Sequence, residues 1–333
     1  MAKIERRKRR GCLLTLLLVL LLAIVVWLIL IPIANNRTAR ALDKVVQENL
    51  SLADYPLEYG EVTVHLMKGQ VGVSHLAMPV EDGIVTAEML QVKVSLGQLI
   101  AFVLQKGLRL ITPAVHVVNL EYDDKELNLG TATAVVTLEI FLDRSLPEEA
   151  VVRKLDLDAR DVHIVVSEGT SIICQDIQLA LKGNMTLATL EKDVDGVLDD
   201  LGYIDVKAIE GTILPDAETM AQLGMFALVS PWIADTNNWR FESLMVEARA
   251  LEQAIVVDSL ALHAPLMEAS GTASLPRKGF QAVSMQLDVA TLHNQVRTEL
   301  APIAQFMGQT IPSGAFGLSF IWDGLTLPEL SFY

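Results

Sequence analysis

The histidines of this 333-residue chain are scattered rather than grouped. None of the six lies four residues from another, which is the spacing of paired metal ligands on a helix. His65 and His75 flank a predicted turn at 68–70, so we expect them to face each other across a hairpin. Two histidines without a third ligand make a poor metal site. The sequence therefore predicts ordinary strand histidines and no metal.

Two acidic segments, LDLDARD and DVDGVLDD, bring carboxylates close together along the chain. Their aspartates are Asp156, Asp158, Asp161, Asp193, Asp195, Asp199 and Asp200. A calcium loop needs oxygen ligands at fixed offsets, with glycine at its sixth position and a closing glutamate. Gly196 is misplaced for this role, and no glutamate closes the loop. Solvated turns and a helix N-terminus are therefore expected here.

Motifs for covalent or cofactor chemistry are missing from the sequence. The segment from Gly72 to His75 has a serine but lacks the second glycine of a nucleophile turn. No phosphate loop, zinc-protease helix or dinucleotide fingerprint occurs. Cys12 and Cys174 are too few for a zinc site. We therefore expect no enzyme and no cofactor, with an anchored enzyme whose site has no known motif as an alternative.

The strongest signal in the chain is an apolar run near its start. Residues Cys12–Ile33 form 22 uncharged residues, which span about 30 Å as a helix, the thickness of a bilayer core. The run is longer than a signal-peptide core and lacks a cleavage site after it. It predicts an uncleaved signal anchor at residues 12–34. Its expected membrane-spanning side chains include Leu13, Leu17, Leu21, Val25, Trp27 and Leu30.

The charge distribution predicts how the anchor is oriented. Residues 1–11 form a basic stub, whose topology-determining side chains are Arg6, Arg7, Lys8, Arg9 and Arg10. The positive-inside rule places this stub in the cytoplasm and residues 35–333 on the other side of the membrane. The whole chain has a net charge of −15, and no later segment is basic enough for nucleic acid. Membrane lipids are the expected partners.

Beyond the anchor, the sequence predicts a mainly β fold with short helices. We expect a juxtamembrane helix and linker at 35–58, then a β-rich domain at 59–333 with possible repeat halves 59–215 and 236–333. Alternating apolar residues predict strands at 61–67, 71–78, 84–96, 108–121, 127–142, 162–166, 172–181, 241–250, 254–262, 266–275, 280–290, 315–322 and 325–332. Helices are predicted at 98–105, 187–201, 217–233 and 292–307. Long strands with one apolar face predict a long antiparallel sheet whose apolar face must be covered by a second sheet, by the chain's own helices or by an apolar ligand.

Three segments resemble AsmA-like proteins, a family of membrane-anchored, β-rich envelope proteins. They are VTVHLMKGQVGVSHLAMPVEDGIVTAEMLQVKVSLGQLIAFVLQKGLRLITPAVHVV, LEQAIVVDSLALHAPLMEASGTASL and PSGAFGLSFIWDGLTLPELSF. The resemblance implies a curled sheet with a hydrophobic groove that carries phospholipid acyl chains between membranes. It also implies that the chain is anchored in the inner membrane with its bulk in the periplasm. The chain departs from the family in its short length and at Glu121–Gly130, where an Asn-Trp pair is often found.

The expected function is binding or handling of phospholipid in an apolar groove, in envelope lipid homeostasis. Candidate groove residues are Val62, Val64, Leu66, Val92, Val94, Leu96, Ile100, Phe102 and Val103. About fourteen strands spaced ~4.8 Å apart would extend roughly 65 Å, which is too short to bridge a wide envelope gap alone. The alternative is a structural or interaction scaffold whose core is filled by its own helices and which carries no lipid.

Overall fold

The structure is a computed structural model, and its described residues are 35–40, 44, 58–79, 83–98, 109–124, 127–143, 146–166, 170–186, 200–216, 221, 231, 234–277, 283–306, 308–322 and 329–333. The predicted anchor at 12–34 and the basic stub lie outside them. Within the described residues, no helix is both long and apolar enough to cross a membrane.

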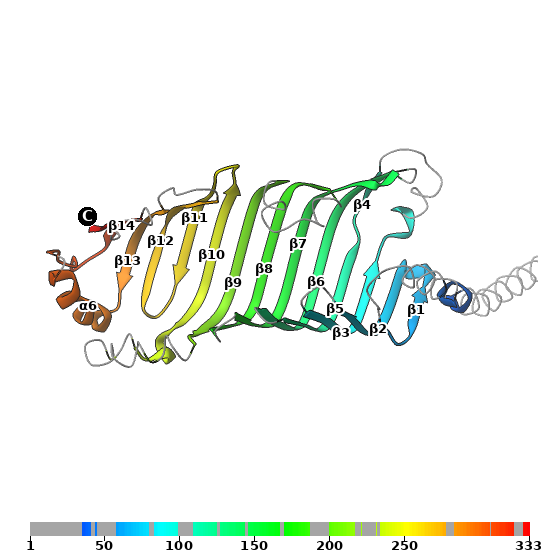
Figure 1. Ribbon diagram of the computed structural model, residues 1–333, viewed down its shortest axis with the longest axis horizontal. Coiled ribbons are helices and arrows are strands. Elements are labelled where there is room, and N and C mark those ends of the chain that lie inside the picture. The colour runs from blue at the N-terminus through cyan, green and yellow to red at the C-terminus, as the bar shows by residue number, and fades with distance from the viewer. Residues whose placement is uncertain are drawn as a thin grey trace, which may run out of the picture.

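Most of the described residues form one open antiparallel sheet of 15 strands (Figure 1). Its strands are β1 (Val62–His65), β2 (Gln70–Pro79), β3 (Gly83–Lys93), β4 (Arg109–Ile111), β5 (Ala114–Asp124), β6 (Leu127–Asp143), β7 (Leu146–Val166), β8 (Ser171–Thr186), β9 (Leu201–Leu214), β10 (Arg240–Ala250), β11 (Ala254–His263), β12 (Met267–Pro276), β13 (Val283–Leu292), β14 (Phe316–Trp322) and β15 (Glu329–Phe332). Strands pair in chain order, except that β4 pairs with β6. Both predicted repeat halves lie in this one sheet.

The mainly β prediction is confirmed, but two strands differ from it. The sequence prediction gave only the last five residues of β7 and omitted β9. Both strands carry a charged residue at almost every second position, as in LDLDARD and IDVKAIE. The predicted strand at 108–121 divides into β4 and β5 at Pro113, because proline cannot donate a ladder hydrogen bond.

Helices contribute little to the described residues. They are η1 (Leu66–Lys68), η3 (Thr236–Asn238) and α6 (Asn294–Phe306), and residues 35–40 and 96–98 are also helical. The predicted helix 292–307 corresponds to α6, which lies at the C-terminal end of the sheet (Figure 1). The predicted helix 187–201 is wrong at its end because Leu201 begins β9. Most of the predicted helices 98–105 and 217–233 lies outside the described residues.

The two histidines of the first hairpin do not face each other, contrary to the prediction. The chain reverses through η1 and Gly69, whose φ of 59° is left-handed. His65 is therefore paired with Gln70, and His75 lies farther along β2, beside Gly60. The turn comes earlier in the chain than the predicted one, so the register shifts.

The prediction of a turn at the first acidic segment, LDLDARD, is also wrong. Asp156, Asp158 and Asp161 lie inside β7. Leu155, Leu157 and Ala159 alternate with the acidic residues, and this alternation suits a strand with one wet face. The second acidic segment lies outside the described residues except for Asp200.

A line of unusual backbone conformations crosses the sheet from β2 to β9. Four residues other than glycine have left-handed φ values, namely His75 (50°), Asn119 (48°), Asp161 (52°) and Glu210 (49°). They lie on β2, β5, β7 and β9, which all run in the same direction. The register aligns them, because Leu120 pairs with Thr131 and Thr131 pairs with Val162, one residue beyond Asn119 and Asp161. We call this line the crease.

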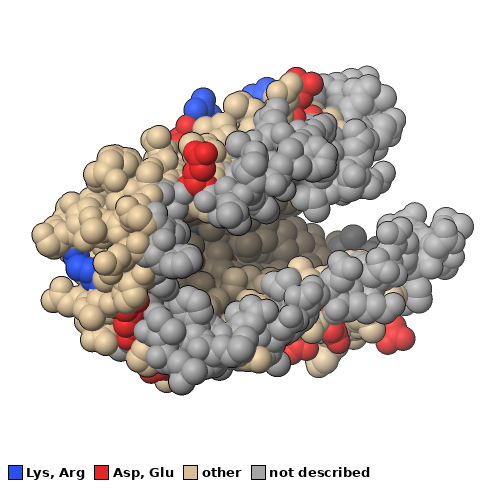
Figure 2. All heavy atoms as spheres, turned by 60° about the vertical axis from the view of Figure 1, so that its left-hand side comes forward, with Lys and Arg blue, Asp and Glu red and all other residues tan. Residues whose placement is uncertain are grey.

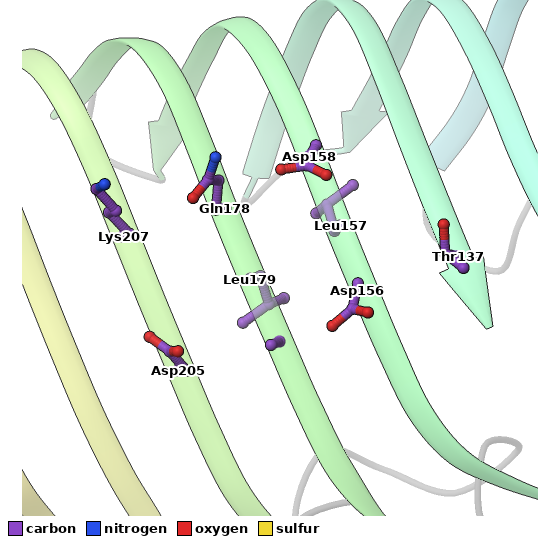
Figure 3. A pocket seen from close by; sticks show the side chains of 9 residues that line it. Thr137, Asp156, Leu157, Asp158, Gln178, Leu179, Asp205 and Lys207 are labelled. Carbon is purple, nitrogen blue, oxygen red and sulfur yellow. The ribbon is translucent and has the colours of Figure 1, made fainter. Parts of the chain in front are cut away.

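Each strand changes its alternation at the crease. Along β7, Ala159 and Val162 are both buried, whereas Arg160 and Asp161 between them are both exposed. A left-handed residue departs from the extended path, so it bends the strand and lets two successive side chains face outward. Neighbouring strands bend together, and they arch over as a group (Figure 3).

Small side chains fill the inside of the bend. Beside the crease, the buried residues include Ala87, Ala134, Ala159, Cys174 and Ala208, each no more than 6% exposed. Curvature crowds side chains on the concave side of a sheet, so small residues fit there. Gly211 continues this row, because a Cβ on it would lie 2.0 Å from the Phe241 ring.

The crease makes a prediction about stability. Replacing Glu210 by threonine places a β-branched residue at positive φ. The second branch at Cβ adds to the strain that glutamate already has there, so the fold should be destabilised by about 1 kcal/mol. Glu121 is a matched control, because it is an exposed glutamate with ordinary extended backbone on β5. Glu121→Thr should change stability by less than about 0.5 kcal/mol. Unfolding midpoints of the detergent-solubilised chain would measure both, and equal effects would contradict the proposed strain.

Candidate binding face

The sheet has two chemically different faces, and we call the one that carries the buried clusters the inner face. Those clusters join residues from β3 to β14. The strand register extends the face to β1, because Val64 pairs with Val71, which pairs with Val92. Representative inner-face residues are Val73, Leu90, Val117, Val136, Leu157, Leu179, Val206, Val246, Leu262, Leu287 and Leu318.

We call the two borders of the sheet where the strands end its rims. Between the two rims, every inner-face side chain that the structure describes is uncharged. The side chains beside the crease are buried, but Leu157, Leu179 and Val206 on the adjoining wall are only half-buried. Figure 2 shows the result as a deep hollow whose visible lining contains no acidic or basic residue. The acidic and basic residues in that view lie on the outside of the walls.

The polar groups of the crease region are satisfied locally. Thr131 is 6% exposed, and its hydroxyl donates to the backbone oxygen of Arg160 at 2.7 Å. Cys174 is 2% exposed, and burial raises the pKa of its thiol. A protonated, buried thiol behaves as a small apolar group. The crease therefore offers no reactive side chain to the hollow.

The outer face is wet and charged. Arg249 donates two hydrogen bonds to Asp258, at 2.6 and 2.5 Å, which hold the pKa of that carboxyl below its usual value. Arg160 pairs with Asp176 across β7 and β8 at 3.5 Å. These exposed pairs contribute little to stability, but they keep this face in contact with water.

A shallow depression of about 350 Å³ lies on the outer face, over β6 to β9. Its lining residues include Asp156, Asp158 and Lys207. Leu157 and Leu179 also belong to the lining, but their side chains lie on the opposite side of the ribbon (Figure 3). Lys154 donates to Asp156 at 2.5 Å, and this hydrogen bond raises the pKa of the lysine. Among the described residues, no group of three or more His, Cys, Asp or Glu side chains could hold a metal.

The structure separates the candidate groove residues into three groups. Val62, Val64 and Val92 lie on the inner face. Val94 follows β3 and is half-buried, while Leu66 and Leu96 lie at strand ends with 37% and 40% of their surface exposed. Ile100, Phe102 and Val103 lie outside the described residues.

The central part of the inner face was missing from the predicted groove. Leu155 and Leu157 come from β7, and Ile204, Val206 and Ala208 come from β9. The sequence signal that could have identified these residues is the alternation of apolar and charged residues in both strands. In each strand a pair of successive outward residues interrupts that alternation at the crease, and β7 has a second interruption between Val152 and Lys154.

The burial of Cys174 predicts a slow thiol. Because the thiolate is the reactive species and burial disfavours it, Cys174 should react with N-ethylmaleimide at pH 7.5 more than roughly tenfold slower in the folded chain than in urea. A Cys12→Ser background leaves Cys174 as the single thiol, and mass spectrometry follows the adduct. Equally fast reaction in folded and unfolded chain would mean that the crease region opens to water.

Comparisons with protein-family models, with curated proteins and with solved structures found no match to this chain. The resemblance to AsmA-like proteins therefore stays a prediction from the sequence. What the protein does is inferred from the geometry and chemistry of its two faces.

Proposed function

We propose that the inner face is an apolar groove that binds the acyl chains of membrane phospholipid, in a protein anchored in the inner membrane. One observation carries this proposal: the inner face is uncharged between its rims and only half-buried on the wall beside the crease. Exposed apolar surface of this extent is uncommon in a soluble protein and usually marks a binding surface. The groove would handle lipid as part of envelope maintenance.

The composition of the face favours hydrocarbon over a rigid ligand. Its described side chains are mostly Leu, Val, Ile and Ala, and they include no cluster of polar groups that could orient a substrate. Specific small-molecule sites normally contain a few convergent polar groups. A flexible acyl chain needs none, since each buried methylene contributes about 0.8 kcal/mol wherever it lies. Ten buried methylenes would contribute about 8 kcal/mol.

The predicted anchor agrees with this chemistry. A signal anchor at 12–34 would hold the sheet beside a bilayer, which is the source of phospholipid. The resemblance to AsmA-like proteins points to the same use of a curled sheet. With fourteen strands in sequence and about 4.8 Å between neighbours, the sheet extends about 60 Å.

The direct test is native mass spectrometry of the full chain, purified in detergent and released into the gas phase. We expect additional masses that correspond to diacyl phospholipids, identified by extraction and fragmentation. A chain that carries no lipid and takes up none from mixed micelles would overturn the proposal. That result would favour a scaffold of the envelope without lipid cargo.

A pair of neighbouring substitutions tests which face binds. Leu179 lies on the inner face of β8 and Gln178 on its outer face. Leu179→Asn removes an apolar contact of about 2 kcal/mol, so lipid affinity should fall by roughly thirtyfold. Gln178→Asn should leave lipid content unchanged. Thermal unfolding of both variants would verify the fold, and equal lipid loss in both would contradict binding on the inner face.

A further inference from the structure

We propose that the N-terminal edge of the sheet binds the surface of an anionic bilayer. The N-terminal edge consists of η1 (Leu66–Lys68), the end of β3 with residues 94–98, and β4 (Arg109–Ile111). Hydrogen bonds join these segments, since Val94 N donates to Gly69 O at 2.8 Å and Gln98 Nε2 donates to Thr112 Oγ1 at 2.7 Å.

Large apolar side chains stand out from this edge. Leu66 is 37% exposed, Met67 57%, Leu96 40% and Leu110 44%. They come from three separate segments that the hydrogen bonds hold together. Aliphatic and methionine side chains in this setting can enter the boundary between lipid headgroups and acyl chains.

Basic residues accompany them, in a chain with net charge −15. Lys68, Lys93 and Arg109 are exposed on the edge, and residues 62–74, 89–98 and 109–118 contain no Asp or Glu. The helical segment 35–40 adds Arg37 and Arg40. Each basic side chain near an anionic lipid surface favours binding by about fivefold. Apolar and basic groups on one edge match a lipid surface better than a protein interface core, from which lysine is depleted.

The position of the edge identifies which surface it meets. Leu66 N donates a hydrogen bond to Asn35 Oδ1 at 3.1 Å. Asn35 follows the uncharged run that ends at Ile33 by two residues. The edge is therefore tied to the place where the chain would leave the bilayer. The same membrane that holds the anchor is the partner that we infer.

Membrane docking does not depend on lipid cargo in the groove. A sheet with a self-filled hollow would still dock through this edge. Loss of co-purified phospholipid and loss of docking are therefore separate results.

Depth-dependent fluorescence quenching in proteoliposomes tests the proposal. The full chain with Cys12→Ser would carry a thiol-reactive fluorophore at Met67→Cys or, as a control, at Met245→Cys. Met245 is 42% exposed on the outer face of β10, far along the sheet from the edge. Vesicles would contain phosphatidylcholine alone or with phosphatidylglycerol, together with a phospholipid bearing a nitroxide on its acyl chain. We expect several times stronger quenching at Met67→Cys than at Met245→Cys, and stronger quenching with phosphatidylglycerol.

Charge reversal supplies the second arm of the experiment. The triple variant Lys68→Glu, Lys93→Glu and Arg109→Glu should weaken docking by about two orders of magnitude or more. It should therefore abolish the stronger quenching that phosphatidylglycerol produces at Met67→Cys. Equal quenching at the two labelled positions would overturn the proposal. So would quenching that is insensitive to both anionic lipid and charge reversal. If the Met67→Cys label becomes protected as protein concentration rises, whatever the lipid, the edge binds a second copy of the chain. That result would also overturn the proposal.

Discussion

The structure depends on one constraint, which is that the left-handed residues of alternate strands in the sheet stay in register. His75, Asn119, Asp161 and Glu210 bend β2, β5, β7 and β9 at the same level of the sheet. A one-residue slip between any two strands would separate their bends, and it would also turn apolar side chains to the wet face. The same register therefore fixes both the curvature of the sheet and the composition of each face. Asn119 reinforces it, since its side-chain amide donates to Glu88 on β3 at 2.5 Å.

Curvature in turn determines where the inner face is closed and where it is open. Beside the crease, alanines and Cys174 pack closely, and they leave almost no exposed surface. Farther along the wall, Leu157, Leu179 and Val206 have larger side chains that the bend does not crowd. A hollow with a closed floor and a half-buried apolar wall accepts flexible chains of variable length more readily than a rigid ligand. That shape follows from the order of small and large residues along each strand.

Sequence reasoning located most strands but not the irregularities within them. The predicted ranges of β10 to β13 agree with the structure within a few residues, although register shifts interrupt their pairings. In β7, the charged residues of LDLDARD suggested turns, because single-sequence patterns do not reveal that a neighbouring strand supplies hydrogen bonds on each side. The hairpin register of His65 and His75 also failed, since the three residues of η1 move the turn. In β9, the outward pair Ile209 and Glu210 interrupts the alternation, and only the bend of adjacent strands explains why.

The inner face, the outer face and the N-terminal edge of the sheet differ in the charge that they carry. The inner face excludes charge between its rims, while the outer face carries ion pairs such as Arg249 with Asp258. The N-terminal edge differs from both, because it combines Met67 and Leu96 with Lys68 and Lys93 and contains no acidic residue. An acidic outer face would be repelled by an anionic bilayer, so the basic edge is the part of the sheet that can approach it. If the chain docks on a membrane as we propose, this charge pattern favours an orientation in which the sheet meets the bilayer end-on and the inner face begins close to the lipid.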